Sequence, residues 1–185
     1  MTLVNFGSGP HKLPGFVNVD LDAASRPDVV ADLARPLPFR DASVDAIFSE
    51  DCVAYIEREA LVRFLAECRR ILRPGGAMRV LTPDLERLAR LYLDDPGRLM
   101  RFWNTAVGVP LPHGTAADVV NLGMKLAGCW MYDFASFARV ASDAGLDAQR
   151  VAYGESRHPA LRGLDLRRPD EAVRMYLECT PRRVG

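Results

Sequence analysis

The chain opens with two closely spaced apolar segments, Asn5-Phe6-Gly7-Ser8-Gly9 and Phe16-Val17-Asn18-Val19-Asp20. The first predicts a β-strand that runs into a Gly-x-Gly turn, and the second predicts a strand that ends in an acid. In α/β folds this arrangement holds a ribose-bearing cofactor. The glycines let the ligand approach bare backbone, and the carboxylate accepts hydrogen bonds from the ribose hydroxyls. We therefore expect a cofactor site where these two strands end.

The connection between the two segments is unusually short. Only six residues, Pro10 to Gly15, separate Gly9 from Phe16, whereas a crossover with a full helix needs about ten to twelve residues. A nicotinamide or flavin cofactor normally places its pyrophosphate on the N-terminus of such a helix. S-adenosylmethionine has no phosphate, so the short connection favours it over NAD. A tight glycine turn without any ligand is the structural alternative.

Composition indicates one domain that spans residues 1–185. The chain has 185 residues, 49% of them hydrophobic, and its 24 basic residues balance its 24 acidic ones. This balance gives no indication of a nucleic-acid or membrane partner. There is no apolar run long enough to span a membrane and no signal region at the start, so we expect a cytoplasmic protein. The cysteines are scattered, which predicts four buried reduced thiols and no metal site: Cys52, Cys68, Cys129 and Cys179.

Strand and helix patterns alternate along the chain, which predicts an α/β fold with a parallel sheet and helices on its faces. The expected strands cover residues 2–6, 16–20, 27–32, 44–49, 77–82, 151–153 and 173–179. An apolar stripe predicts a helix over 61–72 that ends at Pro74-Gly75-Gly76. Further helices are expected after Asp84 and Asp133, each of which can cap the helix that follows it.

Residues 96–131 interrupt this alternation, with helical patches and no expected strand. The short first connection leaves a cofactor uncovered, so we expect this insert to act as a lid and to bind the acceptor. Its candidate side chains are Trp103, Trp130, Tyr132, His113 and Asn121. Ordinary core packing is the alternative for the aromatic residues. A partner subunit could supply the cover instead, which makes a homodimer a hypothesis.

Six segments, taken in order, resemble the class I S-adenosylmethionine-dependent methyltransferases, especially small members of that family. The segments are Asn5-Phe6-Gly7-Ser8-Gly9, Val19-Asp20-Leu21-Asp22, Asp32-Leu33 with Leu37-Pro38-Phe39, Ser43-Val44-Asp45, Ser49-Glu50-Asp51 and Arg69-Arg70-Ile71-Leu72-Arg73-Pro74-Gly75-Gly76. The resemblance covers nearly the whole chain. It implies a Rossmann-like sheet that is mostly parallel with an antiparallel last strand, a shortened first helix and a helical insert after strand five.

The resemblance also implies how these residues hold S-adenosylmethionine. The methionine portion and ribose would be lined by Phe6, Gly7, Ser8 and Gly9. Asp20 would take the ribose hydroxyls, Leu21 would pack on the adenine, Asp32 would accept the adenine amino group, the Leu33 amide would face a ring nitrogen, and the Ser49 carbonyl would meet the methionine ammonium. For both aspartates, a polar strand end in water is the alternative.

The candidates for catalysis are Asp51, His11 and His113. Many relatives carry histidines where this chain has Asp51 and Tyr55. Tyr55 can replace an orienting histidine through its hydroxyl, whereas a proton-abstracting role would fall to Asp51. His11 follows the glycine turn and His113 lies in the expected lid. The basic segment 157–168 could bind an acidic group of the acceptor or form a solvated loop.

These features predict methyl transfer to an oxygen or nitrogen of a small-molecule acceptor. The alternative is a protein that binds S-adenosylmethionine or S-adenosylhomocysteine without catalysis, as a sensor or partner subunit. An NAD-dependent oxidoreductase is a third reading, but the sequence has no room for its phosphate-binding helix.

Overall fold

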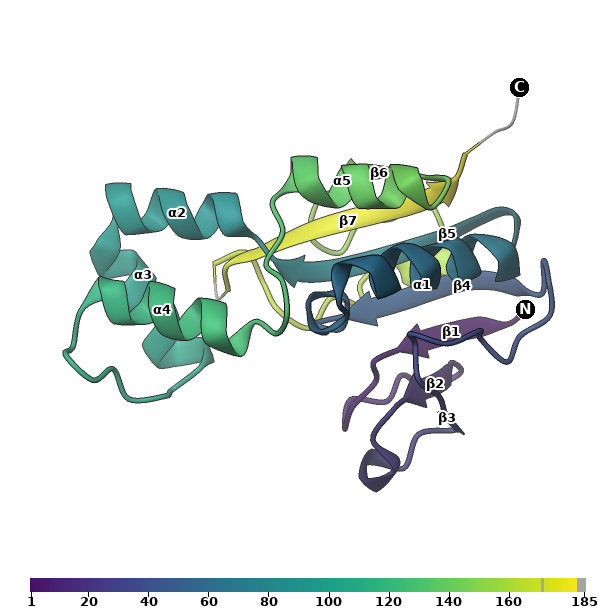
Figure 1. Cartoon of the computed structure of the whole chain (residues 1–185), viewed down its shortest axis with the longest axis horizontal. Coiled ribbons are helices and arrows are strands. Elements are labelled where there is room, and N and C mark those ends of the chain that lie inside the picture. The colour runs from purple at the N-terminus through teal and green to yellow at the C-terminus, as the bar shows by residue number, and fades with distance from the viewer. Residues whose placement is uncertain (171, 183–185) are drawn as a thin grey trace.

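The computed structural model describes residues 1–170 and 172–182 and contains one seven-stranded sheet with the order β3-β2-β1-β4-β5-β7-β6 (Figure 1). The strands are β1 (Leu3–Phe6), β2 (Val17–Asp20), β3 (Val29–Val30), β4 (Val44–Glu50), β5 (Leu72–Pro83), β6 (Leu146–Arg150) and β7 (Arg174–Pro181). Strand β7 runs antiparallel to both of its neighbours, β5 and β6, whereas the strands from β3 to β5 pair in parallel. The predicted fold class, with an antiparallel last strand, is confirmed.

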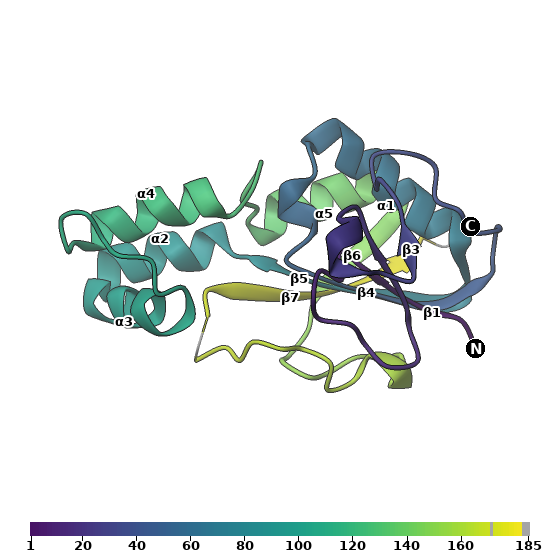
Figure 2. The ribbon, with the colours of Figure 1, turned by 90° about the horizontal axis from the view of Figure 1, so that it is seen from below.

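Helices α1 (Arg58–Ile71) and α5 (Phe134–Asp143) cover one face of this sheet (Figure 2). The five α-helices are α1 (Arg58–Ile71), α2 (Leu85–Asp94), α3 (Pro96–Ala106), α4 (Ala116–Leu126) and α5 (Phe134–Asp143). Short 3-10 turns are η1 (Ala23–Ser25), η2 (Val53–Tyr55) and η3 (Pro159–Leu161). The apolar stripe of α1 is fully buried against the sheet, as its helical spacing predicts, and Phe137 of α5 joins the same cluster.

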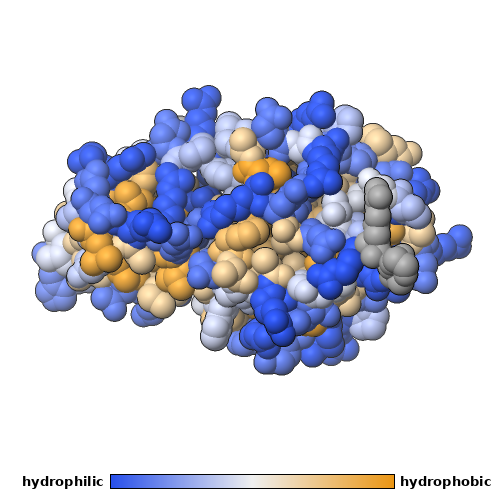
Figure 3. All heavy atoms as spheres, turned by 90° about the horizontal axis from the view of Figure 1, so that it is seen from above, coloured by the Kyte–Doolittle hydropathy of each residue, from blue (hydrophilic) through white to orange (hydrophobic). Residues whose placement is uncertain are grey.

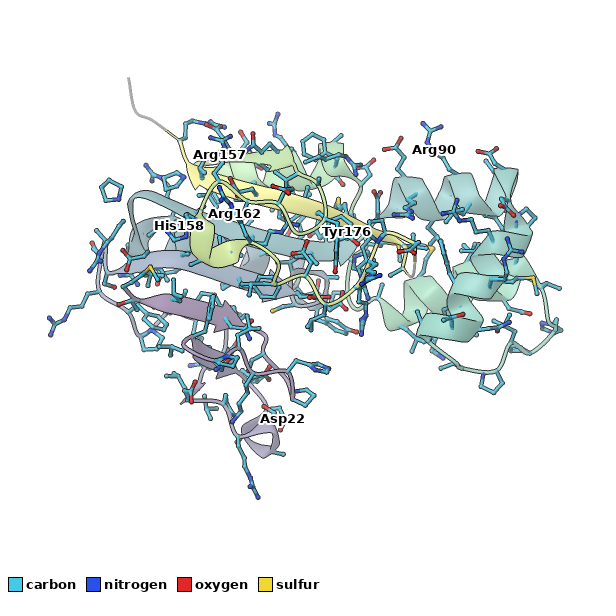
Figure 4. All side chains as sticks on the ribbon, turned by 180° about the vertical axis from the view of Figure 1, so that it is seen from behind. Asp22, Arg90, Arg157, His158, Arg162 and Tyr176 are labelled. Carbon is cyan, nitrogen blue, oxygen red and sulfur yellow. The ribbon has the colours of Figure 1, made fainter. Side chains whose placement is uncertain are left out.

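The opposite face is covered by the irregular connection between β6 and β7, with η3 as its only helical turn in the described part. Figure 4 shows Arg157, His158 and Arg162 on this connection, and Tyr176 of β7 on the same side of the sheet. The connection is fastened by a fully buried ion pair in which Arg79 Nε of β5 donates to Asp165 Oδ1 at 3.0 Å. The same guanidinium also donates to two backbone carbonyls of the connection.

Asparagines organise the connection between β1 and β2, where the described chain forms no helix. The Asn5 amide donates to Asn18 Oδ1 at 3.0 Å, and that oxygen also accepts from the Leu13 amide at 2.8 Å. Asn18 in turn donates to the carboxylate of Asp28. Both asparagines are buried, so the side-chain amides supply the hydrogen bonds that a crossover helix would otherwise make within itself.

Four sequence predictions are corrected. Helix α1 ends at Ile71, and Pro74-Gly75-Gly76 lies within β5, where the register against β4 shifts. A Cβ on Gly76 would stand 2.8 Å from the Asp45 carbonyl oxygen, so the glycine permits close strand approach. Strand β6 ends before Val151 instead of starting there, and β3 is only two residues long. Cys129 is exposed, although all four thiols are free as expected.

The insert is a packed unit of three helices, α2, α3 and α4, beyond the carboxyl ends of β4 and β5 (Figure 1). Leu88, Leu99, Trp103 and Val119 form its buried centre. The unit therefore begins with α2 at Leu85, earlier than the expected boundary at residue 96. Apolar surface gathers over these helices (Figure 3). None of the helices in the described ranges is long and apolar enough to cross a membrane.

Candidate functional site

The two glycines after β1 are needed for different reasons. Gly7 has φ +69°, and a Cβ there would lie 2.4 Å from the Cβ of Cys52, so no side chain fits between the turn and the segment after β4. Gly9 has φ +47° and would meet nothing within 4 Å. Ser8 between them is buried, and its Oγ has no hydrogen-bond partner in the described chain. Open space at Gly9 and an unpaired hydroxyl beside it fit a polar ligand.

Asp20 closes this turn from the end of β2. Its Oδ2 accepts from the Gly9 amide at 2.7 Å, and its Oδ1 accepts from the Asp22 amide at 2.9 Å. An ionised carboxylate has about four acceptor sites, so Asp20 retains capacity for hydroxyl donors of a ligand. The adjacent Leu21 is 67% exposed, which is unusual for a leucine and leaves an apolar surface next to the carboxylate.

Asp32 follows the neighbouring strand end, since β2 and β3 pair through Asp20 and Val30. Its carboxylate accepts from the Ala34 amide at 2.9 Å and lies 3.4 Å from Arg35 Nε. The side chain of Leu33 is buried in the apolar cluster. Asp20, Leu21 and Asp32 thus lie at the same edge of the sheet.

Phe6 and Ser49 are buried at the ends of β1 and β4. The Phe6 ring packs edge-on against Phe39 and Phe64, at centroid distances of 6.1 and 5.2 Å. Phe6 and Leu33 can therefore contribute only backbone atoms to a ligand site. The segment after β4 carries Cys52, and burial raises the pKa of its thiol to about 12, which makes it a poor nucleophile.

A cavity of about 180 Å³ lies against the glycine turn, and we call it the glycine-loop cavity. Its lining is Asn5, Gly7, Ser8, Gly9, Pro10, His11, Leu13, Phe48, Glu50, Asp51, Leu166 and Arg167. It brings together the predicted residues Gly7, Ser8, Gly9, His11 and Asp51. The other predicted cofactor residues do not line it: Phe6, Asp20, Leu21, Asp32, Leu33 and Ser49.

A larger cavity of about 390 Å³, the insert cavity, lies between the three-helix insert and the sheet. Its lining is Asp51, Tyr55, Pro83, Leu88, Leu99, Phe102, Trp103, Ala106, Val107, Val119, Gly123, Leu126, Ala127, Met131, Arg167, Ala172, Val173 and Arg174. This volume is within the range of small-molecule sites. The lining is apolar apart from its charged end at Asp51, Arg167 and Arg174. Asp51 and Arg167 line both cavities, so these two side chains form a shared wall.

Asp51 adopts the left-handed backbone region at φ +53°, which is uncommon outside glycine. Its Oδ1 lies 2.5 Å from Arg174 Nη1, and its Oδ2 accepts from Arg167 Nη1 at 3.4 Å. Burial raises the pKa of Asp51 despite these two arginines, and burial also lowers the pKa of Arg174. Neighbouring Glu50 accepts from the Leu166 amide at 3.2 Å.

The histidines differ in position. His11 is exposed beside the glycine turn and lines the glycine-loop cavity. His113 is 80% exposed by its side chain, with Nδ1 2.9 Å from Asp118 Oδ1, and it lines neither cavity. This contact is the largest reason why the pKa of Asp118 falls to about 2. His113 thus braces the start of α4.

The other side chains expected in the lid lie in different surroundings. Only Trp103 lines the insert cavity, whereas Trp130 is half exposed, Tyr132 belongs to the core of the sheet and Asn121 is an exposed residue of α4. The Tyr55 hydroxyl donates to the Leu126 carbonyl at 2.9 Å, which fits the orienting role predicted for it.

Sequence reasoning did not find Arg174, and it noted Arg167 only as part of a basic segment. Arg174 begins β7, and its neighbours in sequence gave no sign that it would meet Asp51. The contact depends on β7 pairing with β5, so that Arg174 lies opposite Pro83 at the carboxyl end of β5. An arginine near the start of the expected last strand was the only available signal.

Residues 14–80 match a family model described as a methyltransferase domain. Over 65 residues the chain is 46% identical to a malonyl-[acyl-carrier protein] O-methyltransferase of Methylococcus capsulatus, covering 35% of this chain and 22% of that protein. Over 108 residues it is 31% identical to a dimethylglycine N-methyltransferase of Parasynechococcus marenigrum, covering 51% of this chain and 38% of that protein. The matches thus span less than half the length of these relatives.

Solved structures share the whole fold. A TehB-like SAM-dependent methyltransferase from Corynebacterium glutamicum has a TM-score of 0.54 at 14% identity, covering 98% of this chain and 80% of that one. DhpI in a complex with SAM and HEP has a TM-score of 0.57 at 15% identity, covering 97% and 78%. At such identities the likeness establishes the fold alone. Together with the family match over residues 14–80 it confirms the predicted resemblance to the class I S-adenosylmethionine-dependent methyltransferases.

Proposed function

We propose that this protein transfers a methyl group from S-adenosylmethionine to an oxygen or nitrogen of a small-molecule acceptor. The observation that carries the proposal is the shared wall of Asp51 and Arg167 between two cavities. One cavity borders the glycine turn and the other is apolar and of ligand size. Methyl transfer needs two adjoining sites, because the acceptor atom must reach the methyl group in line with the sulfur while donor and acceptor are each held in place.

The residues at the sheet edge fit S-adenosylmethionine. Gly9 leaves open space, Ser8 offers an unpaired buried hydroxyl, and Asp20 retains acceptor capacity for ribose hydroxyls. Asp32 and the exposed Leu21 would hold the adenine. When bound, the cofactor supplies an electrophilic methyl group on a positively charged sulfur. A partner subunit that supplies the cover over the cofactor stays a prediction, as does the homodimer.

Asp51 is the residue we assign to the acceptor side of the site. Its two arginines hold the carboxylate in place, so it can orient an acceptor hydroxyl or amine or receive its proton. The largely apolar lining of the insert cavity would bury the body of the acceptor. His11 is the remaining candidate base because it lines the glycine-loop cavity, whereas we leave His113 out of the proposed catalytic set.

The test is calorimetric titration of the protein with S-adenosylhomocysteine, comparing Asp20→Ala with Asp22→Ala. Asp22 is a matched control because it is also an acid, lies two residues away and caps η1 through the Ala24 amide. We expect micromolar binding that Asp20→Ala weakens at least about tenfold, since charge-assisted hydrogen bonds to the ribose are lost. Asp22→Ala should bind nearly as the parent does.

Absence of binding by the folded parent protein would count against the proposal. Binding without turnover on any acceptor would instead favour the non-catalytic alternative. Asp51→Asn separates these two readings once an acceptor is known, because a catalyst should lose turnover and still bind S-adenosylhomocysteine. A binder has no turnover to lose.

A further inference from the structure

The charged end of the insert cavity contains an arginine whose hydrogen bonds are incomplete. The side chain of Arg174 is only 16% exposed, and its Nη1 lies 2.5 Å from Asp51 Oδ1. This contact is an ion pair without hydrogen-bond geometry. Asp51 Oδ1 and Arg174 Nε both lack a hydrogen-bond partner within the described residues. Arg174 therefore holds a buried donor that nothing in the described chain satisfies.

An unpaired guanidinium donor is costly in such surroundings. A buried donor without a partner loses its hydration and receives no bond in exchange. The remainder of this cavity is lined mostly by aliphatic and aromatic side chains, and none of them accepts a hydrogen bond from Arg174 Nε. A molecule bound in the cavity can supply the missing partner, and an anionic oxygen binds a guanidinium more strongly than a neutral one does.

The local charges indicate what kind of anion fits. Arg167 and Arg174 are opposed by Asp51 and Glu50, so the charges of these four side chains balance when both acids are ionised. Burial raises the pKa of both acids and lowers the pKa of Arg174, so a net charge of either sign is disfavoured here. A planar group with a single charge fits this balance better than a phosphate dianion does.

We propose that the insert cavity binds apolar molecules that carry a carboxylate, with Arg174 as the residue that recognises the carboxylate. This proposal rests on the proposed function, because it names the acceptor class for the same site. The apolar body of the molecule would lie among the insert helices beside Trp103. Its carboxylate would lie at the shared wall, and Asp51 would hold Arg174 in position.

The test compares 3-phenylpropionate with 3-phenylpropionamide, two probes that differ in charge and little in shape. Trp103 lines the cavity and Trp130 is the second tryptophan of the chain. In a Trp130→Phe background, therefore, tryptophan fluorescence reports on the cavity directly. Titrations with and without saturating S-adenosylhomocysteine measure the affinity of each probe, and turnover is not needed.

We expect the carboxylate to bind about tenfold more tightly than the amide. Arg174→Gln should abolish this preference and leave the affinity for the amide nearly unchanged. Arg168→Gln is the control, because Arg168 is an exposed arginine of the same connection and lines neither cavity. It should preserve the preference.

Equal affinities for the two probes, or no fluorescence response to either while S-adenosylhomocysteine binds, would overturn the proposal. If Arg174→Gln does not fold, the affinities of the two probes for the parent protein still show whether the insert cavity prefers a carboxylate. Failure of the protein to bind S-adenosylhomocysteine would count against the proposed function instead. The probe titrations without that ligand would then report separately on the cavity.

Discussion

The two faces of the sheet are built by opposite means. On one face, α1 and α5 bury a continuous apolar cluster with regular helical spacing. On the other, the irregular connection between β6 and β7 lies over a few apolar residues and is held by buried charges. Arg79 meets Asp165, and Glu178 accepts from the Ser156 hydroxyl and the Arg157 amide. Both faces exclude water, but only the second depends on particular polar partners.

This difference bears on function because the polar face reaches the site. Arg167 of the connection lines both cavities, and the Leu166 amide donates to Glu50 at the end of β4. The Tyr176 hydroxyl donates to the Arg167 carbonyl at 2.6 Å. An apolar cluster tolerates changes that keep its volume, whereas this connection needs its hydrogen bonds to place Arg167. The helix face thus carries stability and the polar face also positions a wall of the site.

The largest effect is expected from Asp165→Ala. The substitution leaves the fully buried guanidinium of Arg79 without its counter-charge, and breaking such a pair typically costs about 3–5 kcal/mol. Urea denaturation followed by circular dichroism measures the free energy of unfolding. A loss below about 1 kcal/mol would show that water replaces the carboxylate, and that this face is less dry than its burial indicates.

The double variant Arg79→Met with Asp165→Leu is the matched control. Replacing a buried ion pair by apolar residues is often close to neutral, so much of the lost stability should return. The hydrogen bonds from Arg79 to the Ala152 and Glu155 carbonyls are not restored, which keeps the recovery incomplete.

On the helix face, Leu65→Ala should lower the free energy of unfolding by about 3 kcal/mol, because it opens a cavity in the apolar cluster. Leu65 is fully buried in α1, and no polar group is stranded by its truncation. Exposed Arg63 of the same helix provides the control, and Arg63→Ala should change stability by less than about 0.5 kcal/mol. Equal effects of the two substitutions would mean that α1 does not pack as described.

The smallest effect concerns Glu50, whose pKa is raised by burial and by the charge of Asp51. A raised folded-state pKa favours the protonated acid. The contribution of protonated Glu50 to the free energy of unfolding is therefore present below the unfolded pKa and is lost as the pH rises through the folded pKa. Glu50→Gln should thus stabilise the protein at about pH 8, by less than about 1 kcal/mol, and the gain should vanish towards about pH 4.

Urea denaturation of the parent and Glu50→Gln proteins across this pH range measures the difference. A gain that grows at acidic pH would reverse the sign and show that Glu50 is stabilised as a carboxylate. The Leu166 amide could then be its dominant partner, since a glutamine side chain can accept that hydrogen bond as well.

The helix face was predictable from the sequence and the polar face was not. The stripe of α1 repeats at helical spacing, and Asp84 and Asp133 accept from the amides that cap α2 and α5. These are local patterns. Arg79 and Asp165 are 86 residues apart, and an arginine in an otherwise apolar strand gives no indication of its partner. Pro74-Gly75-Gly76 misled for a similar reason, because a strand bulge and a helix stop use the same residues.

The site shows the same division. Gly7, Ser8, Gly9 and Asp20 could be named from their places at strand ends, because the carboxyl ends of parallel strands share one edge. Which of the expected lid residues would face the insert cavity could not be predicted, since side-chain direction on α3 and α4 depends on how the helices pack together. Trp103 faces the cavity whereas Asn121 faces solvent, and their sequence neighbourhoods do not distinguish them.

Two cavities with a common wall can affect each other's ligands through the side chains that they share. A ligand in the insert cavity that draws Arg167 or Asp51 towards itself changes the shape and charge that the glycine-loop cavity presents. Thermodynamic linkage then makes the effect reciprocal: whatever factor the first ligand applies to the affinity of the second, the second applies to the first. A tightly bound product on one side of the wall would also influence release on the other.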